Sequence, residues 1–157
     1  MKHLLLLRHA EAEAAAPGAS DNDRPLTEHG RLEAMDAAQC ISRTHLQIDA
    51  VLASSARRTR ETAAIVVSRL NLSVAIVHES SLYLATADTL LRAINACHAP
   101  TQTLLLVAHN PGVSELAHQL SGGERVSALR TGGLCQLTFR QADWRDLGTP
   151  AAVQLLR

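Results

Sequence analysis

Two apolar runs, each long enough for a buried strand, end in a histidine. Leu4–Leu7 is followed by Arg8 and His9, and Leu104–Ala108 is followed by His109. Runs that are apolar throughout, rather than alternating, are typical of central parallel strands covered by helices on both faces. Ligands bind such sheets at the carboxyl edge, so the two histidines are expected to meet there.

The remaining sequence alternates between strand-length apolar runs and stretches with helical periodicity. This pattern predicts the α/β class, as one three-layer α/β/α domain over residues 1–157 with a mostly parallel central sheet and helices on both faces. The fifth of the six runs comes closer to alternation and is expected at the edge, in antiparallel direction. The expected strands cover residues 2–8, 49–53, 74–78, 103–108, 134–140 and 152–156.

Four helices are expected between these strands. Apolar residues at spacings of three and four predict the face that each helix buries. The first helix is expected to be capped by Thr27, and the second by Ser54 or Ser55. The third is expected to cover residues 86–98. The fourth is expected to have Asn110 as its cap and Pro111 as its first residue, and to end at Gly122–Gly123. The expected buried positions are Leu32, Met35, Ala38 and Ile41; Ala63, Val66, Val67 and Leu70; Leu90, Ile94 and Cys97; and Val113, Leu116, Ala117 and Leu120.

Composition argues against several classes of partner. The 15 basic and 15 acidic residues cancel, so no global field attracts nucleic acid or anionic lipid. Only three aromatic residues occur, which disfavours a surface for stacking bases: Tyr83, Phe139 and Trp144. No run approaches the ~18 apolar residues of a membrane span. We therefore expect neither nucleic acid nor a membrane as partner.

The three cysteines are far apart and odd in number. None forms a C-x-x-C pair, and all lie in apolar segments: Cys40, Cys97 and Cys135. They are expected to be small, reduced core residues. The apolar stretch near the N-terminus stops at Arg8, too early for a signal peptide. These features favour a cytoplasmic protein.

Three arginines crowd the expected start of the second helix. At Arg57, Arg58 and Arg60 the helix macrodipole disfavours positive charge by ~0.3–1 kcal/mol each. An anion bound near the helix amides would offset this repulsion. The alternative is a solvated basic face, which we favour for Arg57 and Arg60. At least one of the three is expected to face the sheet edge that carries the histidines.

A zinc site is the alternative use of the two histidines. It would take His9, His109 and Glu11, but divalent sites rarely tolerate arginines pointing inward, and no further ligand stands at metal spacing. We therefore expect no metal. The other histidines lack such context and are expected to be surface or hydrogen-bonded residues: His3, His29, His45, His78, His98 and His118.

Four motifs, in this order, resemble those of the histidine phosphatase superfamily, and the chain is most similar to its small SixA-type phosphohistidine phosphatases. The resemblance covers residues 1 to about 122. The motifs are Arg8-His9-Ala10-Glu11, Arg24-Pro25-Leu26-Thr27-Glu28-His29-Gly30, Ser54-Ser55-Ala56-Arg57-Arg58-Thr59-Arg60-Glu61-Thr62-Ala63 and Val107-Ala108-His109-Asn110-Pro111-Gly112.

The resemblance implies a phosphoglycerate mutase-like fold and a role for each matching residue. His9 is implied as the nucleophile that accepts the phosphoryl group. Arg8, Arg58 and His109 are implied to bind that group, and Arg24 to contribute to the substrate pocket. Ser54 and Asn110, from the same motifs, are further expected substrate-binding residues. Ala10 departs from the glycine that usually follows the Arg-His pair.

No residue matches the acid that protonates ester leaving groups in many relatives, and Glu79 is only a candidate. An alkoxide needs such an acid, worth ~10²–10⁴-fold in rate. Imidazole, with a conjugate-acid pKa of ~6.5, needs far less help. We therefore expect a phosphohistidine phosphatase that acts on protein substrates through a phosphohistidine on His9. The alternatives are a small phosphomonoesterase that uses Glu79 and an inactive phosphate-binding module.

The expected partners follow from this interpretation. They are phosphate or a phosphorylated histidine on another protein, with no cofactor, and the chain is expected to be a monomer. The connection between Glu79 and Thr89 is too short for a large lid domain, and an open site suits a side chain presented by another protein.

Overall fold

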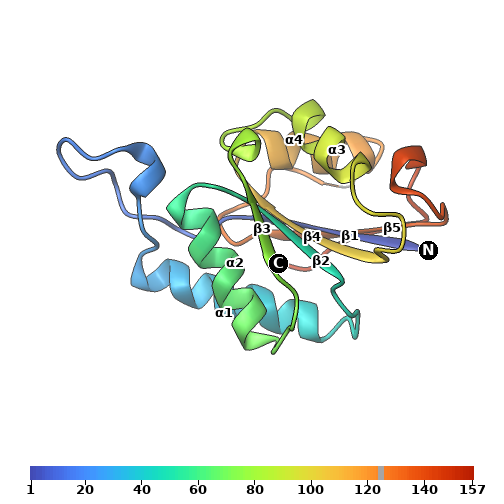
Figure 1. The fold of residues 1–157 in the computed structure, drawn as a ribbon, viewed down its shortest axis with the longest axis horizontal. Coiled ribbons are helices and arrows are strands. Elements are labelled where there is room, and N and C mark those ends of the chain that lie inside the picture. The colour runs from blue at the N-terminus through green and yellow to red at the C-terminus, as the bar shows by residue number, and fades with distance from the viewer. Residues whose placement is uncertain (124–125) are drawn as a thin grey trace.

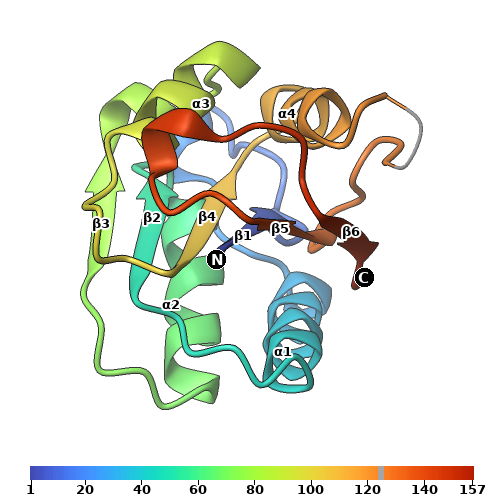
Figure 2. The ribbon, with the colours of Figure 1, turned by 90° about the vertical axis from the view of Figure 1, so that its right-hand side faces the viewer.

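The two apolar runs form adjacent central strands of one sheet in a computed structural model that describes residues 1–123 and 126–157. Strand order across the sheet is β3-β2-β4-β1-β5-β6 (Figure 2). The strands are β1 (Lys2–Arg8), β2 (Ala50–Ser54), β3 (Ile76–Glu79), β4 (Thr103–Ala108), β5 (Leu134–Phe139) and β6 (Ala152–Leu155).

The register of the central pair brings the two histidines together. Strands β1 and β4 are parallel, and Arg8 pairs with Ala108, the residue before His109. The backbone amide of His9 then donates to the Ala108 carbonyl, 3.0 Å away. Because β2 and β3 are parallel to β4, four strands end at the same edge of the sheet. The expected mostly parallel sheet is confirmed.

Strand β5 is antiparallel, as expected, but it is not at the edge. It lies between β1 and β6 and pairs with both. The prediction of an edge position was wrong because the short run after it closes the sheet on that side. Strand β6 is largely exposed, whereas β5 buries four of its six residues. The near alternation of β5 therefore reflects one partly solvated face, not a missing neighbour.

Two helices cover each face of the sheet, which confirms the three-layer arrangement (Figure 1). Helices α1 (Glu28–Ser42) and α2 (Arg57–Arg69) lie on one face, and α3 (Ala87–Asn95) and α4 (Gly112–Leu120) on the other. Three single 3-10 turns complete the structure: η1 (Asp21–Asp23), η2 (Ser80–Leu82) and η3 (Trp144–Asp146). Both η1 and η2 lie in connections that leave the carboxyl edge of the sheet or return to it.

The strands alternate between two apolar cores. Leu4 and Leu6 belong to the core under α3 and α4, whereas Leu5 and Leu7 belong to the core under α1 and α2. All four leucines are fully buried. This two-sided burial explains why the run is apolar throughout, and it fixes the strand that carries Arg8 and His9.

The expected helix caps hold for one helix and fail for two. Thr27 accepts a hydrogen bond from the amide of Gly30, as expected for the cap of α1. Helix α2 is preceded by Ala56 without a side-chain cap, and α4 by Pro111 in place of Asn110. Ser54 still belongs to β2, and the Asn110 side chain bonds to Leu129 and Ser114 instead of a helix amide.

The predicted buried face of α1 was wrong in part. Ala38 and Ile41 are buried, but Leu32 is 58% exposed and Met35 is 36% exposed. A strict spacing of three falls short of one helical turn by about 60° per step, so four such residues drift around the helix. The residues that α1 does bury are Gly30, Glu33, Ala34, Ala37, Ala38 and Ile41.

The other helices bury the expected residues, some only in part. Seven of the expected positions are buried: Ala63, Val66, Leu90, Ile94, Val113, Leu116 and Ala117. Four others are partly buried against the same cores: Val67, Leu70, Cys97 and Leu120.

The three cysteines are all free, as expected. Cys135 is buried, and Cys40 and Cys97 are partly buried. Within residues 1–123 and 126–157, no helix combines the length and apolar character that crossing a bilayer demands.

Candidate active site

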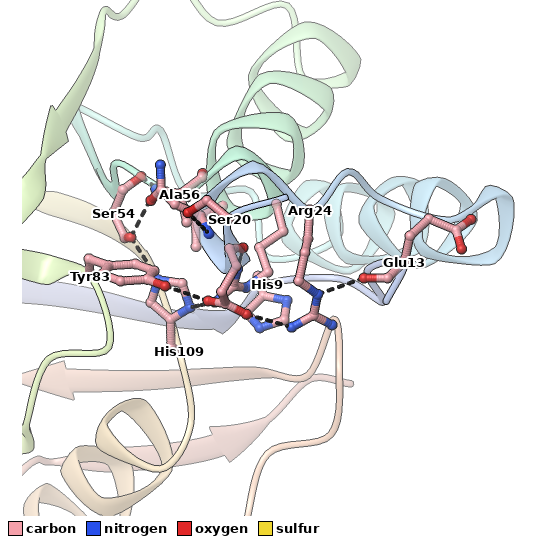
Figure 3. A network of polar contacts seen from close by, with 12 residues as sticks. His9, Glu13, Ser20, Arg24, Ser54, Ala56, Tyr83 and His109 are labelled. Carbon is pink, nitrogen blue, oxygen red and sulfur yellow. Dashed lines mark hydrogen bonds and ion pairs between the residues drawn. The ribbon is translucent and has the colours of Figure 1, made fainter. Parts of the chain in front are cut away.

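The carboxyl edge of the sheet holds a cavity of about 350 Å³. Figure 3 shows the side chains of His9, Arg24, Tyr83 and His109 gathered at this edge. The cavity is lined by Arg8, His9, Glu11, Ala12, Asp21, Arg24, Arg58, Leu84, His109, Asn110 and Thr131. The structure thus brings together the four residues expected to bind and accept a phosphoryl group.

His9 is held with one ring nitrogen free. Its Nδ1 lies 2.7 Å from the carbonyl oxygen of Ala10. Because a carbonyl can only accept, Nδ1 carries the hydrogen and Nε2 keeps its lone pair. The pKa of His9 is lowered to about 4, and burial is the largest cause. The hydrogen bond to the Ala10 carbonyl raises this pKa by less than burial lowers it, and the positive charges of Arg58 and Arg8 lower it further. At neutral pH the ring is therefore an uncharged base.

His109 is also neutral in the free protein. Its Nε2 lies 2.6 Å from Ser54 Oγ, and Arg58 Nη2 lies 3.3 Å from its Nδ1. A guanidinium only donates, so Nδ1 accepts and Nε2 carries the hydrogen that it gives to Ser54. The pKa of His109 is lowered to about 3, and burial is the largest cause. The positive charge of Arg58 and the nearby His9 are the next causes, and both also lower this pKa. A bound dianion would act in the opposite direction and favour the charged ring.

Among the three arginines at the start of α2, the structure singles out Arg58. It is 2% exposed, and its side chain lies against His109. Arg57 and Arg60 are exposed, and Arg57 pairs with Glu61 at 2.8 Å. This confirms the interpretation favoured for Arg57 and Arg60, the solvated face. The i, i+1 spacing explains the split, because successive helix residues point about 100° apart.

Arg8 and Arg58 both keep a donor without an acceptor. Arg8 Nη1 donates to the carbonyl of Leu129 at 3.1 Å, and the two Nη atoms of Arg58 are also engaged. In the part of the chain that the structure describes, the buried Nε of each arginine finds no hydrogen-bond partner. Leaving a buried donor unpaired costs about 1–3 kcal/mol, so both guanidiniums are suited to an added anion.

The remaining expected site residues differ in where they lie. Arg24 and Asn110 line the cavity. Ser54 does not line it but holds His109, and its Oγ also accepts from the amide of Ala56. Glu79 pairs with Ser54 in the sheet, and its carboxylate accepts from Ser81 Oγ at 3.3 Å. Glu79 is not among the residues that line the cavity.

Sequence reasoning missed several residues of the site, and among them Asp21 and Tyr83 directly contact predicted site residues. The Asp21 carboxylate accepts hydrogen bonds from Arg58 Nη2 at 3.1 Å, from Arg24 Nη1 at 3.0 Å and from the Tyr83 hydroxyl. The ring of Tyr83 meets His109 edge-on, with centroids 5.6 Å apart. Tyr83 could have been noticed as one of three aromatic residues, but nothing in the loop around Asp21 signalled its contacts.

The hydrogen bonds to Asp21 stabilise its charged form. The hydroxyl of Tyr83 contributes most, followed by Arg24 and Arg58, and together they hold the pKa of Asp21 well below its usual range. Asp21 is therefore an ionised carboxylate at neutral pH. It is an acceptor in this site and has no proton to donate.

A zinc ion would require a further ligand beside the two histidines. The ring centroids of His9 and His109 are 5.3 Å apart. Across the described ranges 1–123 and 126–157, no three His, Cys, Asp or Glu side chains are grouped as a metal ion requires. The arrangement of two neutral imidazoles with the half-buried guanidinium of Arg8 and the buried one of Arg58 is instead suited to a phosphoryl group, whose oxygens match the arginine donors.

Comparisons with known proteins show which family this chain resembles in sequence and fold. The model of the histidine phosphatase superfamily (branch 1) matches residues 4–82. An uncharacterized protein of Mycobacterium tuberculosis is 35% identical in an alignment of 150 residues that covers 90% of this chain and 91% of the relative. A solved structure of the protein histidine phosphatase SixA complexed with tungstate is 25% identical, covers 98% of this chain and 97% of its own, and superposes with a TM-score of 0.82.

A second solved structure is similar over most of its length. It comes from Agrobacterium tumefaciens and is provisionally named phosphohistidine phosphatase SixA. It is 33% identical, covers 87% of this chain and 91% of its own, and has a TM-score of 0.78. The matching family model, the similar folds and the shared motifs lead to one conclusion: this chain belongs to the histidine phosphatase superfamily.

Proposed function

We propose that the protein is a metal-independent phosphatase that removes phosphate from phosphohistidine side chains of other proteins, with His9 as the covalent acceptor. The observation that carries the proposal is the state of His9. Its Nδ1 is engaged with Ala10, so Nε2 offers a lone pair into a cavity that also holds Arg8 and Arg58. The resemblance to a protein histidine phosphatase complexed with tungstate, a phosphate-like anion, supports it.

The first half of the reaction transfers the phosphoryl group to His9. The lone pair of Nε2 forms a bond to phosphorus while the bond from phosphorus to the substrate nitrogen breaks. The electron pair stays on the leaving imidazole, which takes up a proton from water. Arg8 and Arg58 stabilise the charge on the equatorial oxygens, and catalysis of this kind is mostly positioning and charge stabilisation.

The second half restores the enzyme. A water oxygen bonds to phosphorus, the bond to Nε2 breaks, and its electron pair returns to the ring. The proton of the attacking water passes to solvent or to the product phosphate. His109, beside Arg58, is placed to become protonated and donate once a dianion is present, because a nearby negative charge raises an imidazole pKa.

The carboxyl groups at the site favour a phosphohistidine over a phosphate ester. Asp21 is ionised and cannot protonate a leaving alkoxide. The carboxylate of Glu11 accepts a hydrogen bond from the Thr27 hydroxyl at 2.8 Å, and Glu79 lies outside the cavity lining. Because imidazole leaves without the help that an alkoxide needs, phosphoramidates are the favoured class. The protein partner, the monomeric state and the cytoplasmic location stay predictions.

The test compares substrates on the purified protein. A phosphohistidine-bearing protein should be hydrolysed at least about 10²-fold faster, in kcat/KM, than a sugar phosphate or a phosphoserine peptide, because only the esters need the acid. Replacing the acceptor, His9→Asn, should remove turnover and the acid-labile label left after brief reaction with a ³²P-labelled substrate. Asparagine retains a donor near the Nδ1 position and so favours a folded variant.

Matched controls make the outcome interpretable. His29 is an exposed histidine on α1, and His29→Asn should leave both turnover and label unchanged. All reactions are repeated with excess chelator, which should have no effect. A sugar phosphate that outpaces the phosphohistidine protein would favour the phosphomonoesterase alternative, and labelling that persists in His9→Asn would exclude His9 as acceptor.

A further inference from the structure

The guanidinium of Arg58 already holds an anion in the free protein, and that anion belongs to the chain itself. Its Nη1 donates to the backbone carbonyl of Asp21 at 2.8 Å, and its Nη2 donates to the Asp21 carboxylate at 3.1 Å. The carboxylate itself therefore takes one guanidinium donor, Nη2, and guanidinium donors are the groups that bind phosphoryl oxygens. Asp21 therefore lines the cavity and engages a donor of Arg58, the residue proposed to bind the phosphoryl group.

A second pair of contacts keeps the carboxylate there. Arg24 Nη1 donates to Asp21 Oδ1 at 3.0 Å, and the hydroxyl of Tyr83 donates to Oδ2. The ring of Tyr83 also lies beside Arg58, with the guanidinium carbon 5.9 Å from the ring centroid. Three donors from three separate parts of the chain therefore converge on one acidic side chain at the mouth of the cavity.

A phosphate dianion and the Asp21 carboxylate cannot both use Arg58 without repulsion. Two negative charges about 4 Å apart repel by roughly 1–4 kcal/mol, depending on how well water screens them. The Asp21 side chain has room to turn toward solvent because it is 45% exposed, whereas that of Arg58 is 3% exposed. Its turn, η1, lies in the segment between β1 and α1 that extends away from the sheet in Figure 1. The carboxylate is thus the partner that can leave.

We propose that Asp21 is a resident competitor of the phosphoryl group, which binds Arg58 in the empty site, is displaced when a phosphoryl group enters, and weakens the hold of the site on inorganic phosphate. The inference rests on the proposed phosphoryl site. Its consequence is that product phosphate leaves more readily, since the carboxylate takes back the Nη2 donor of Arg58. Asp21 would then set affinity and product inhibition without taking part in bond making.

The test measures binding of inorganic phosphate and of tungstate by titration calorimetry at pH 8. Asp21→Asn keeps the shape and removes the charge, and should lower the Kd of both anions about tenfold, as expected for losing one adjacent like charge. The inhibition constant of phosphate in the phosphatase assay should fall by the same factor. Asp23→Asn is the matched control, because Asp23 is exposed in the same turn, and its Kd should stay within about twofold of wild type.

A second variant tests the mechanism of competition. Tyr83→Phe keeps the ring beside His109 and Arg58 and removes only the hydroxyl that holds the carboxylate. It should lower the Kd by about twofold to threefold on its own and change nothing further in the Asp21→Asn background, which is the signature of two residues acting through one contact.

The outcomes separate the inference from the proposed function. Equal Kd values for Asp21→Asn and Asp23→Asn would overturn the inference, as would weaker binding in Asp21→Asn, which would make Asp21 a residue that orients Arg58. If wild type and all variants fail to bind either anion, the phosphoryl site itself is wrong and the inference falls with it. Tighter binding in Asp21→Asn without phosphohistidine turnover would support the competitor and reject the proposed activity.

Discussion

At the scale of single residues, the site depends on histidines that stay neutral beside arginines. Burial is the largest cause for both rings, and it lowers the pKa of His9 to about 4 and that of His109 to about 3. The hydrogen bonds to Ala10 and Ser54 then decide which nitrogen carries the hydrogen. The same features that prepare a nucleophile therefore make the free protein sensitive to acid.

This sensitivity predicts a loss of stability between pH 7 and pH 5. Both folded-state pKa values lie below the ordinary 6.5, so the unfolded chain binds protons first as the pH falls, and each histidine costs about 2 kcal/mol at pH 5. Above pH 6.5 the effect is absent. Urea unfolding at several pH values measures it. His109→Gln should make the pH dependence shallower, and an unchanged slope would show that His109 is not the source.

At the scale of elements, the start of α1 places the segment that follows His9. The amide of Glu11 donates to Glu33 Oε2 at 2.8 Å, and the carbonyl of Glu11 accepts from the amide of Thr27 at 3.0 Å. Gly30 lets this backbone approach closely, because a Cβ at that position would lie 2.0 Å from the Glu11 carbonyl oxygen. The helix cap and the active-site segment thus form one packed unit.

Replacing this glycine should therefore harm both stability and binding. A helix interior normally gains roughly 0.5–1 kcal/mol from Gly→Ala, but Gly30→Ala must push the Glu11 backbone aside and should cost about 1–3 kcal/mol. We expect a lower urea midpoint and weaker phosphate binding. Gln39→Ala, at an exposed position of the same helix, is the control and should change neither. A stabilised Gly30→Ala would contradict the close contact.

At the scale of the whole molecule, attraction for anions is local. The net charge is zero, and the positive charge at the cavity comes from the buried Arg58 together with the partly exposed Arg8 and Arg24. Arg8 is the last residue of β1, whereas Arg58 belongs to the first turn of α2 and contacts η1. Because an anion would join these elements in the folded state only, its binding should stabilise the entire fold.

Phosphate should accordingly raise the melting temperature. At a concentration of about 100 times its Kd, a ligand that binds only the folded state adds about 2.7 kcal/mol, which corresponds to roughly 5–10 °C for a chain of this size. Differential scanning fluorimetry with increasing phosphate measures the shift. Arg58→Gln should remove most of it, and Arg60→Gln, an exposed arginine of the same helix, should retain it. Equal shifts in the two variants would place the anion elsewhere.

Local patterns in the chain determined the sheet and much of the site. Uninterrupted apolar runs predict β1 and β4, because a strand that is buried on both faces has apolar residues at every position. Parallel pairing of these two strands then brings His9 and His109 to one edge of the sheet. The crowded arginines at the start of α2 signalled an anion because the helix dipole acts over one turn. Each of these signals is local in sequence, and the pairing of β1 with β4 then follows from the rule that buried parallel strands lie together in one sheet.

Only the tertiary structure decided which distant groups meet. Asp21 contacts Arg58 across 37 residues and Tyr83 across 62, and such contacts depend on how two loops fold back over the sheet edge. The same holds for β5, which lies inside the sheet because β6 follows it, and for Leu32, which the packing of α1 leaves exposed. Periodicity and motif spacing carry no information about loop paths, because the energy that selects a path comes from contacts made after the elements assemble.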